Sequence, residues 1–417
     1  MRKILHIDLN SFYASVECLL DESLFGKPVA VSGSISDRHG VVLAKNQKAK
    51  ELGVKTGMTV YQAKKLVPDI IIRETHYDKY VKYSKAVKAI FFEYTDYIES
   101  FGIDEAWLDV TNSKKYDGDA YKLAEEIRNR VKDEIGLTVS IGVSFNKVFA
   151  KLGSDLKKPD AVSVIPFERF KDILYPLPVE NLLYVGRATK TKLYKLNIHT
   201  IGDLAQADEE LLVEHLGKWG SILHSYALGL DNSEVKKYLE KDEYKSIGNS
   251  LTFYRDLDND LDVETLLILL SESVCSRMKD YGYKYARTIS INITDNLLAT
   301  TVRMKKFRHP TNLSKEVAEE AMNLFRANYT WMNKVRGLGV ILSDFTSEEQ
   351  LNFDIDMQKQ SKNEKLENTI EGLRKRFGRS AINRAVVLRD EKFVALDIKD
   401  SHSLGSLGKN KNTGSDD

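Results

Sequence analysis

The chain has 417 residues, a net charge of +1, and 42% hydrophobic and 29% charged residues, an ordinary composition for a globular protein that predicts roughly three or four modules. Its two cysteines, Cys18 and Cys275, are too few for a disulfide framework or a zinc site. The longest apolar run, residues 266–270, is too short to cross a bilayer, and Asp8 comes too early for a signal peptide, so we expect a cytoplasmic protein without a membrane segment.

The first predicted module consists of residues 1–20 and 75–167. The spacing of its apolar residues predicts, in chain order, a strand over 3–8, a helix over 12–20 capped by Asn10 and Ser11, a helix over 77–94, a hairpin over 97–110, a helix over 120–135 and a strand over 137–143. This β-α-β-β-α-β order is that of the ferredoxin-like fold, so the sequence predicts an α+β multidomain protein.

The other segments differ in composition and are expected to form separate parts. In chain order they are a turn-rich insertion (21–74), a group of short helices (168–235), a highly charged linker (236–245), a second β-α-β-β-α-β module (246–346), and a tail (347–417) with an amphipathic helix over 366–377 and a disordered end from 401.

Three acidic residues stand where predicted strands begin or end. Asp8 closes the first strand, and Asp104 and Glu105 lie at the tight turn of the hairpin. In a split β-α-β sheet the first and third strands are central neighbours, so these carboxylates are expected to converge. Converging carboxylates repel one another unless cations hold them, and Mg²⁺ prefers such hard oxygen ligands. The alternative is that acids at strand ends are solvated loop residues, and Asp8 taken alone is better explained in that way.

Five stretches of the sequence resemble one known family. They are residues 8–17 (DLNSFYASVE), 102–111 (GIDEAWLDVT), 141–151 (IGVSFNKVFAK), 157–160 (KKPD) and 245–248 (KSIG). In this order they are similar to the Y-family translesion DNA polymerases, which include bacterial DNA polymerases IV and V. The resemblance implies a ferredoxin-like palm (1–20 and 75–167), inserted fingers (21–74), a helix-hairpin-helix thumb (168–235) and a little finger (246–346). It also implies low-fidelity DNA synthesis during the repair of damaged DNA, as in an SOS response.

The resemblance assigns a catalytic metal site to the three acids. Asp8, Asp104, Glu105 and the backbone carbonyl of Leu9 would bind two Mg²⁺ ions, with Mn²⁺ as a substitute, and Glu105 would lie nearest the primer 3′-hydroxyl. Two such cations can activate a hydroxyl and stabilise a leaving phosphate.

Further positions match the family's nucleotide site. Tyr13 matches the steric gate, an aromatic ring that clashes with a ribose 2′-hydroxyl. Phe12 would pack behind the nucleotide, and Lys158 matches the lysine that contacts the triphosphate. Without its flanking motif, Tyr13 is better explained as a half-buried helix aromatic.

The segment 44–55 departs from the polymerase IV pattern, which has a Tyr and an Arg on the triphosphate. This chain has Gln47 and Lys50 there, and Asn10 where polymerase IV has Asp. Lys50 still offers a positive charge to a phosphate, without the bidentate fork of Arg. These residues indicate a triphosphate site closer to that of the polymerase V catalytic subunit.

Two regions outside the palm are expected to hold primer-template DNA. Residues 178–200 resemble a helix-hairpin-helix, with Tyr184 in place of its first glycine, and residues 217–220 are a second copy or a plain helix turn. In the little finger, alternation along the strand places Arg303 and Lys305 on one face. The residues expected to contact DNA phosphates are Arg255, Arg287, Arg303, Lys305, Lys306, Arg308 and Arg336.

The sequence leaves partners and two other functions open. Residues 350–353 (Gln350-Leu351-Asn352-Phe353) resemble a shortened sliding-clamp-binding peptide, and we expect a monomer that uses dNTPs. The alternatives are a nucleotidyl cyclase-like enzyme, whose palm also has paired acids and two metals, and a DNA-binding protein with a decayed palm.

Overall fold

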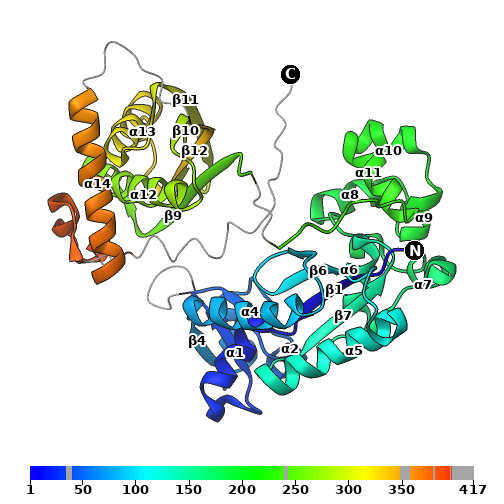
Figure 1. The fold of residues 1–417 in the computed structure, drawn as a ribbon. Coiled ribbons are helices and arrows are strands. Elements are labelled where there is room, and N and C mark those ends of the chain that lie inside the picture. Colours follow the sequence, from blue (N-terminus) through cyan, green and yellow to red (C-terminus); the bar gives the residue numbers. More distant parts are fainter. Residues whose placement is uncertain (34–39, 239–242, 348–356, 379–380, 395, 397–417) are drawn as a thin grey trace. The chain divides into compact units, whose positions relative to one another are not determined.

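The structure is a computed structural model that describes residues 1–33, 40–238, 243–347, 357–378, 381–394 and 396 (Figure 1). It has an α+β fold, and its contacts divide the chain into two compact units with a boundary between Glu240 and Lys241. None of the described helices is both long and apolar enough to cross a membrane.

The first unit contains a five-stranded sheet of order β5-β6-β1-β7-β8. Its strands are β1 (Ile4–Leu9), β5 (Ile98–Ser100), β6 (Glu105–Asp109), β7 (Val139–Ser144) and β8 (Val162–Val164). β1 lies antiparallel between β6 and β7, which is the ferredoxin-like strand order that the sequence predicts, and β8 extends the sheet parallel to β7.

Helices cover both faces of this sheet. The odd-numbered residues of β1 share a core with α4 (Tyr77–Phe92) and α5 (Ala120–Arg130), and the expected helix over 120–135 continues as one π-helical turn to Gly136. The even-numbered residues face α6 (Lys147–Leu156), whose Ala150 packs with Ile4. Asp8 is therefore on the α6 side of the sheet.

Between α1 (Phe12–Leu20) and α4 the chain forms a second, smaller sheet. This segment consists of η1 (Glu22–Leu24), β2 (Val29–Ser32), β3 (Val42–Lys45), α2 (Gln47–Glu51), α3 (Val60–Leu66) and β4 (Ile71–Glu74), with strand order β3-β2-β4. Its core includes Ala30, Val42 and Ala63, so it packs largely within itself.

Only helices and short 3₁₀ turns follow β8 within the described part of the first unit, as expected. They are η4 (Phe167–Arg169), α7 (Phe170–Leu174), η5 (Val179–Asn181), α8 (Arg187–Lys195), α9 (Ile201–Gln206), α10 (Glu209–Leu216) and α11 (Lys218–Ala227). Tyr184, which occupies the glycine position of the hairpin motif, has a φ of 71°, the backbone conformation that glycine adopts most easily. Its ring packs against Trp219, with the ring centres 5.3 Å apart.

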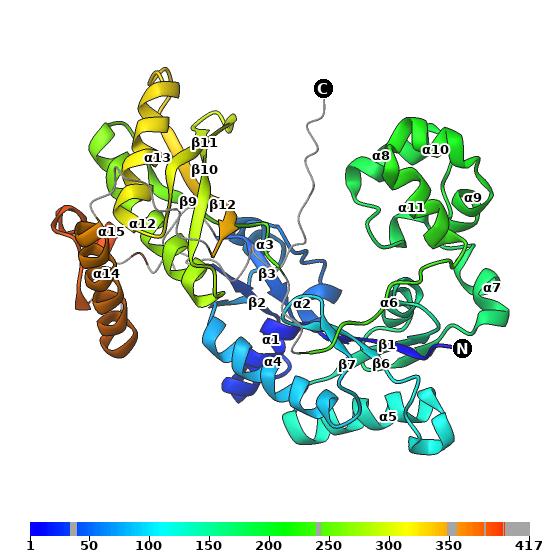
Figure 2. The same cartoon turned by 45° about the horizontal axis from the view of Figure 1, so that its top comes forward.

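The second unit contains an antiparallel sheet of order β11-β10-β12-β9. Its elements follow the predicted β-α-β-β-α-β order: β9 (Ser246–Leu257), α12 (Asp260–Asp280), β10 (Tyr285–Asp295), β11 (Thr300–Thr311), α13 (Ser314–Asn328) and β12 (Val335–Thr346). Both helices pack on one face of the sheet (Figures 1 and 2). The first strand is at the edge here, whereas β1 is central in the first unit.

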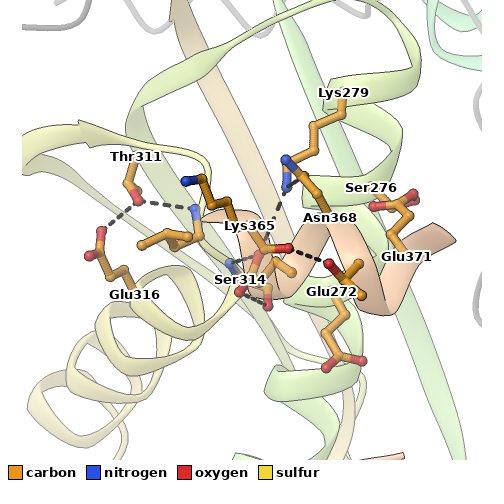
Figure 3. A network of polar contacts seen from close by, with 12 residues as sticks. Glu272, Ser276, Lys279, Thr311, Ser314, Glu316, Lys365, Asn368 and Glu371 are labelled. Carbon is orange, nitrogen blue, oxygen red and sulfur yellow. Dashed lines mark hydrogen bonds and ion pairs between the residues drawn. The ribbon is translucent and has the colours of Figure 1, made fainter. Parts of the chain in front are cut away.

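The described residues after β12 pack onto the second unit. It forms α14 (Met357–Phe377), η7 (Ala385–Arg389) and α15 (Glu391–Val394), so the helix begins nine residues before the predicted Leu366. Polar contacts join α14 to α12 and to the start of α13, where Ser314 hydrogen-bonds Glu367 (Figure 3). The buried Phe393 ring stacks on Phe253, 4.5 Å away. Residues 350–353 and the end from 401 lie outside the described residues.

Candidate active site

The backbone pairing of β1 with β6 brings the predicted acids together. Asp8 is the register partner of Glu105, and the Leu9 amide donates to the Asp104 carbonyl at 3.0 Å. The turn before β6 passes through Gly102 at a φ of 99°, where a side chain would be strained and would approach the Asp104 carboxylate. The hairpin therefore places two acids beside the end of β1.

Lysine side chains neutralise two of these acids. Lys158 Nζ lies 2.8 Å from Asp8 Oδ2, and Lys151 Nζ lies 2.5 Å from Glu105 Oε2. The fully buried His6 ring also contacts Glu105, with 3.2 Å between Nε2 and Oε2. The sequence analysis did not assign His6 or Lys151 to the site, although Lys151 ends a stretch that resembles the polymerase family and His6 lies two residues before another. His6 alternates with Asp8 on β1, which could have placed it on the same face.

The three carboxyl groups have different pKa values because their surroundings differ. Burial, and then the nearby charges of Glu105 and Asp104, raise the pKa of Asp8 to about 7 despite Lys158. Burial and Glu105 also raise the pKa of Asp104. Burial acts in the same direction on Glu105, but the His6 hydrogen bond and the Lys151 charge together outweigh it and lower the Glu105 pKa to about 2.

The donor chemistry of these acids fits a hard divalent cation. Within the described residues, no three His, Cys, Asp or Glu side chains come close enough to complete a metal site on their own. Three carboxylates nevertheless share one partly buried place, and two of them have raised pKa values, which shows a shortage of positive charge there. Oxygen ligands of this kind favour Mg²⁺.

The loop that carries Lys158 is fixed to the end of β1 by Asn10. The Asn10 side chain donates to Ser140 Oγ at 2.8 Å and accepts from the Asp160 amide at 2.9 Å. Arg128 also binds the Asp160 carboxylate, at 2.8 Å. The expectation that Asn10 and Ser11 cap α1 is wrong, because Ser11 makes no side-chain cap and Asn10 is used for this loop.

The predicted gate residue Tyr13 lies in a cluster of aromatic rings. It begins α1 next to the buried Phe12, with ring centres 5.7 Å apart. It also stacks on Tyr80 of α4 at 4.3 Å and an interplanar angle of 11°. Burial, followed by the charge of Asp104, raises the Tyr13 pKa to about 12. Asp104 therefore lies close enough to Tyr13 for its charge to be felt at the phenol.

The predicted phosphate ligand Lys50 is an exposed residue of the short helix α2. The neighbouring Gln47 is occupied by a hydrogen bond to Glu51 at 3.0 Å. Lys45 is at the end of β3. Burial, followed by the nearby charge of Lys50, lowers the Lys45 pKa. Lys45 is thus a second cationic group of this segment that the sequence analysis did not select.

The basic residues expected to bind DNA do not gather on one open face of the second unit. Arg303 and Lys305 are register partners of Ile291 and Ile289, so they share the helix-covered face. There Lys305 pairs with Glu320 of α13 at 2.5 Å, and Arg303 hydrogen-bonds Asn328. The prediction that Arg303 and Lys305 share one face is thus confirmed, whereas their contact with DNA phosphates stays a prediction.

Arg255 is likewise used within the second unit. Its guanidinium pairs with Asp262 at 2.7 Å and lies 3.7 Å from Asp390, which precedes α15. Arg287 is half-buried, and its Nε has no partner within the described structure. Arg308 is exposed on β11, and Arg336 is half-buried on β12.

The open face of the second sheet carries mostly small and polar residues. Ser290 lies opposite Met304 on β11 and Ile341 on β12, and Thr288 lies opposite Lys306, so these residues face away from the helices. The same face carries Ser246, Ser250, Thr252, Asn292, Thr294, Gly337, Gly339 and Ser343. A flat face rich in hydroxyl groups and glycine lets another molecule approach the sheet closely.

Comparison with known proteins gives a consistent result along the chain. Residues 7–155 match the model of the impB/mucB/samB family, and residues 244–355 match its C-terminal domain. The chain is 48% identical over 392 residues to a DNA polymerase IV of Acetivibrio thermocellus, covering 93% of the chain and 98% of the relative. It is 36% identical to DNA polymerase IV 1 of Bacillus subtilis, covering 94% of both. It is 34% identical to DNA polymerase IV of Clostridium acetobutylicum, covering 93% and 98%.

The structure is also similar to a solved polymerase. A chimeric Y-family DNA polymerase superposes with a TM-score of 0.71 at 25% identity, covering 82% of this chain and 99% of the other. The named relatives are of the polymerase IV type, whereas Asn10, Gln47 and Lys50 had indicated the polymerase V type. These three residues therefore did not predict the type of the named relatives.

Proposed function

The chain belongs to the impB/mucB/samB family of Y-family polymerases and is a translesion DNA polymerase, and from this premise we propose that Asp8, Asp104 and Glu105 are its catalytic acids. The observation that carries the assignment is the register pairing of Asp8 with Glu105, with Asp104 in the adjoining turn. In this reading residues 1–20 and 75–167 are the palm, 21–74 the fingers, 168–235 the thumb and 246–346 the little finger.

Y-family polymerases generally need divalent metals, and we propose that this enzyme uses two Mg²⁺ ions, with Mn²⁺ as a substitute. Asp8, Asp104, Glu105 and the Leu9 carbonyl would hold them. When bound, such cations activate the primer 3′-hydroxyl and neutralise charge on the leaving pyrophosphate.

The protein's own groups orient the acids and bind the nucleotide. His6 and Lys151 both contact the Oε2 oxygen of the Glu105 carboxylate, which restricts its rotation. Lys158 lies at 2.7 Å from Asp155 as well as beside Asp8, so its ammonium stands at the edge of the acid cluster, where a triphosphate would bind. Lys50 would supply a more distant charge from the fingers.

Tyr13 and Phe12 would shape the pocket for the sugar of a dNTP. Both begin α1, directly after the acid-bearing end of β1, so a nucleotide whose phosphates lie near Asp8 would place its sugar near the Tyr13 ring. A ribose 2′-hydroxyl would then collide with that ring, which disfavours ribonucleotides.

Primer-template DNA would be held mainly through its phosphates. In the little finger, we assign this role to the open sheet face with Lys306, and to Arg287, Arg308 and Arg336. In the thumb, the turn at Tyr184 and the N-terminus of α8 would offer backbone N–H groups to a phosphate. We also propose that the enzyme acts as a monomer in the cytoplasm and that Gln350–Phe353 binds a sliding clamp.

A primer-extension assay tests the proposed chemistry. With a labelled primer on a template, dNTPs and Mg²⁺, the purified chain should lengthen the primer and release pyrophosphate. Formation of a cyclic nucleotide from a triphosphate alone, with no elongation, would contradict the proposal.

A further inference from the structure

The carboxylate of Glu17 is fully buried and does not contact the catalytic acids. Glu17 lies on α1 one helical turn after Tyr13, and its side chain is 0% exposed. A buried carboxylate is unfavourable unless hydrogen bonds satisfy it. None of the roles assigned above uses this charge.

Three donors from the neighbouring segment satisfy Glu17. The Tyr80 hydroxyl donates to Oε1 at 2.6 Å, the His76 Nδ1 lies 2.9 Å from the same oxygen, and Arg73 Nε donates to Oε2 at 3.4 Å. Tyr80 and Arg73 act as donors, and His76 donates as well when its proton is on Nδ1. Arg73 is on β4, and His76 and Tyr80 are at the start of α4, so one acid joins three elements.

Tyr80 connects this carboxylate to the proposed sugar gate. Its ring is 0% exposed and lies nearly parallel to the Tyr13 ring, with centres 4.3 Å apart. Phe12 meets the Tyr80 ring edge-on at 6.3 Å, which limits its rotation. α1 lies beside α4 in both views of the fold (Figures 1 and 2). The Tyr80 ring is thus held at its hydroxyl by Glu17 and on its edge by Phe12.

We propose that Glu17 is a positioning residue for sugar selection: it fixes the Tyr80 ring, and the Tyr80 ring fixes the plane of Tyr13. A steric gate discriminates only if its ring does not yield, because a side chain that moves by a fraction of an ångström admits the extra hydroxyl. The stack offers Tyr13 a rigid backing, and the charge-assisted hydrogen bond from Tyr80 is the contact that keeps the backing in place. This inference rests on the proposed role of Tyr13 as the gate.

The test is the ratio of kcat/KM for a dNTP to kcat/KM for the matching rNTP. Tyr80→Phe keeps the ring and removes the hydroxyl, and Glu17→Gln keeps the shape and removes the charge. Each should lower the ratio about five- to ten-fold, since Tyr80 acts on the sugar only through the Tyr13 ring and part of the energy of the lost charge-assisted hydrogen bond is felt there. A merely destabilised enzyme would lose activity with both sugars and keep its ratio.

A matched control is available in the same unit. Tyr94 also donates its hydroxyl to a carboxylate, Glu126, at 2.9 Å, whereas the rings paired with Tyr13 are those of Phe12 and Tyr80. Tyr94→Phe should therefore leave the sugar ratio unchanged. Tm measurements on all variants show whether any of them is largely unfolded at the assay temperature.

Variants made in the Tyr13→Ala protein separate the positioning role of Glu17 from the role of Tyr13 as the gate. Tyr13→Ala should lower the ratio strongly, and adding Tyr80→Phe to it should cause no further change. If Tyr13→Ala lowers the ratio while Tyr80→Phe and Glu17→Gln keep the wild-type value, the positioning role is refuted and the gate stands. If Tyr13→Ala leaves the ratio unchanged, the proposed gate fails and the positioning role fails with it.

Discussion

The two large sheets of this protein share one order of elements along the chain but differ in the order of their strands. In the first unit β1 is central, so its terminal Asp8 has Glu105 of β6 as a direct neighbour. In the second unit the equivalent strand β9 is at the edge and pairs only with β12. The first arrangement gathers acids, and the second presents a broad face. The order of elements alone thus does not decide where a site forms.

The buried acids of the two units differ in the same way. In the first unit, burial and neighbouring carboxylates raise the pKa of Asp8 to about 7, so its charge is poorly satisfied. In the second unit, Glu272 on α12 is bound by Arg374 at 3.0 Å and by Arg384 at 2.6 Å. A poorly satisfied acid is expected to serve function at a cost in stability, and a well satisfied acid to serve the fold.

Removing an acid from the first cluster should have the largest effect. Asp104→Ala is expected to reduce the rate of primer extension by about a thousand-fold or more, because it removes a proposed metal ligand. Binding of primer-template DNA, measured by fluorescence anisotropy, should stay near the wild-type value. Extension at the wild-type rate would refute the site.

The free energy of unfolding should change in opposite directions when Glu272 and Asp8, the buried acids of the two units, are neutralised. Glu272→Gln is expected to lower the free energy of unfolding by about 2 kcal/mol, because two arginines lose their charged partner. Glu319→Gln is the matched control, since Glu319 forms an exposed i,i+4 pair with Lys315 and should change little. Urea titrations of all three proteins measure the difference.

Asp8→Asn should instead stabilise the protein at high pH when a chelator has removed its metal ions. The folded protein holds the Asp8 proton up to about pH 7, against 3.8 for an ordinary Asp, so wild-type stability falls as pH rises across that window. The Asn variant lacks this loss. Its advantage should be near zero at pH 4 and about 4 kcal/mol at pH 8. An advantage that does not depend on pH would contradict the explanation.

Two neighbouring lysines, Lys157 and Lys158, test the role of positive charge beside the acid cluster of the first unit. Lys158→Ala should raise the KM for dNTP and lower kcat/KM about ten- to thirty-fold, because a phosphate contact is lost. Lys157 is the adjacent exposed lysine, and Lys157→Ala should change these constants little. Steady-state kinetics with one dNTP distinguishes them, and equal effects would show that only general positive charge matters.

The smallest effect should come from the second sheet. Lys306 is on its open face, whereas Lys305 pairs with Glu320 on the helix-covered face. Lys306→Ala should weaken DNA binding about three-fold and reduce the salt dependence by about one counterion. Lys305→Ala should leave that slope unchanged. The reverse result would place the DNA on the other side of the sheet.

Most of the fold could be predicted from the sequence, because periodicity reports burial. The spacing of apolar residues predicted the main strands and helices of the first sheet and the β-α-β-β-α-β order of the second, with ends shifted by a few residues. It did not predict the separate elements within 21–74 and 168–235, or the strand β8. It could not show that β9 lies at an edge, since strand order depends on pairing between distant segments. The packing of α14 and α15 was also missed, because Phe393 and Val387 stand in a segment with little periodicity.

The candidate site was predicted in part, for a related reason. Asp8 and Glu105 could be brought together from topology, but their partners His6 and Lys151 required knowledge of which faces meet. Arg303 and Lys305 were expected to contact DNA because of the resemblance to the little finger, and sequence alone could not show that they also contact Asn328 and Glu320 of α13. Charge patterns identify candidate ligands, whereas only packing shows which charges are already used.

The most direct test of the account is the number of divalent cations held by the first acid cluster. Mn²⁺ bound to the protein, with primer-template and an unreactive dNTP analogue, can be counted by electron paramagnetic resonance. We expect about two ions per wild-type chain, and at least one fewer for Asp104→Ala with DNA still bound. The same number of ions in both proteins would contradict the assignment of Asp8, Asp104 and Glu105 as the metal site.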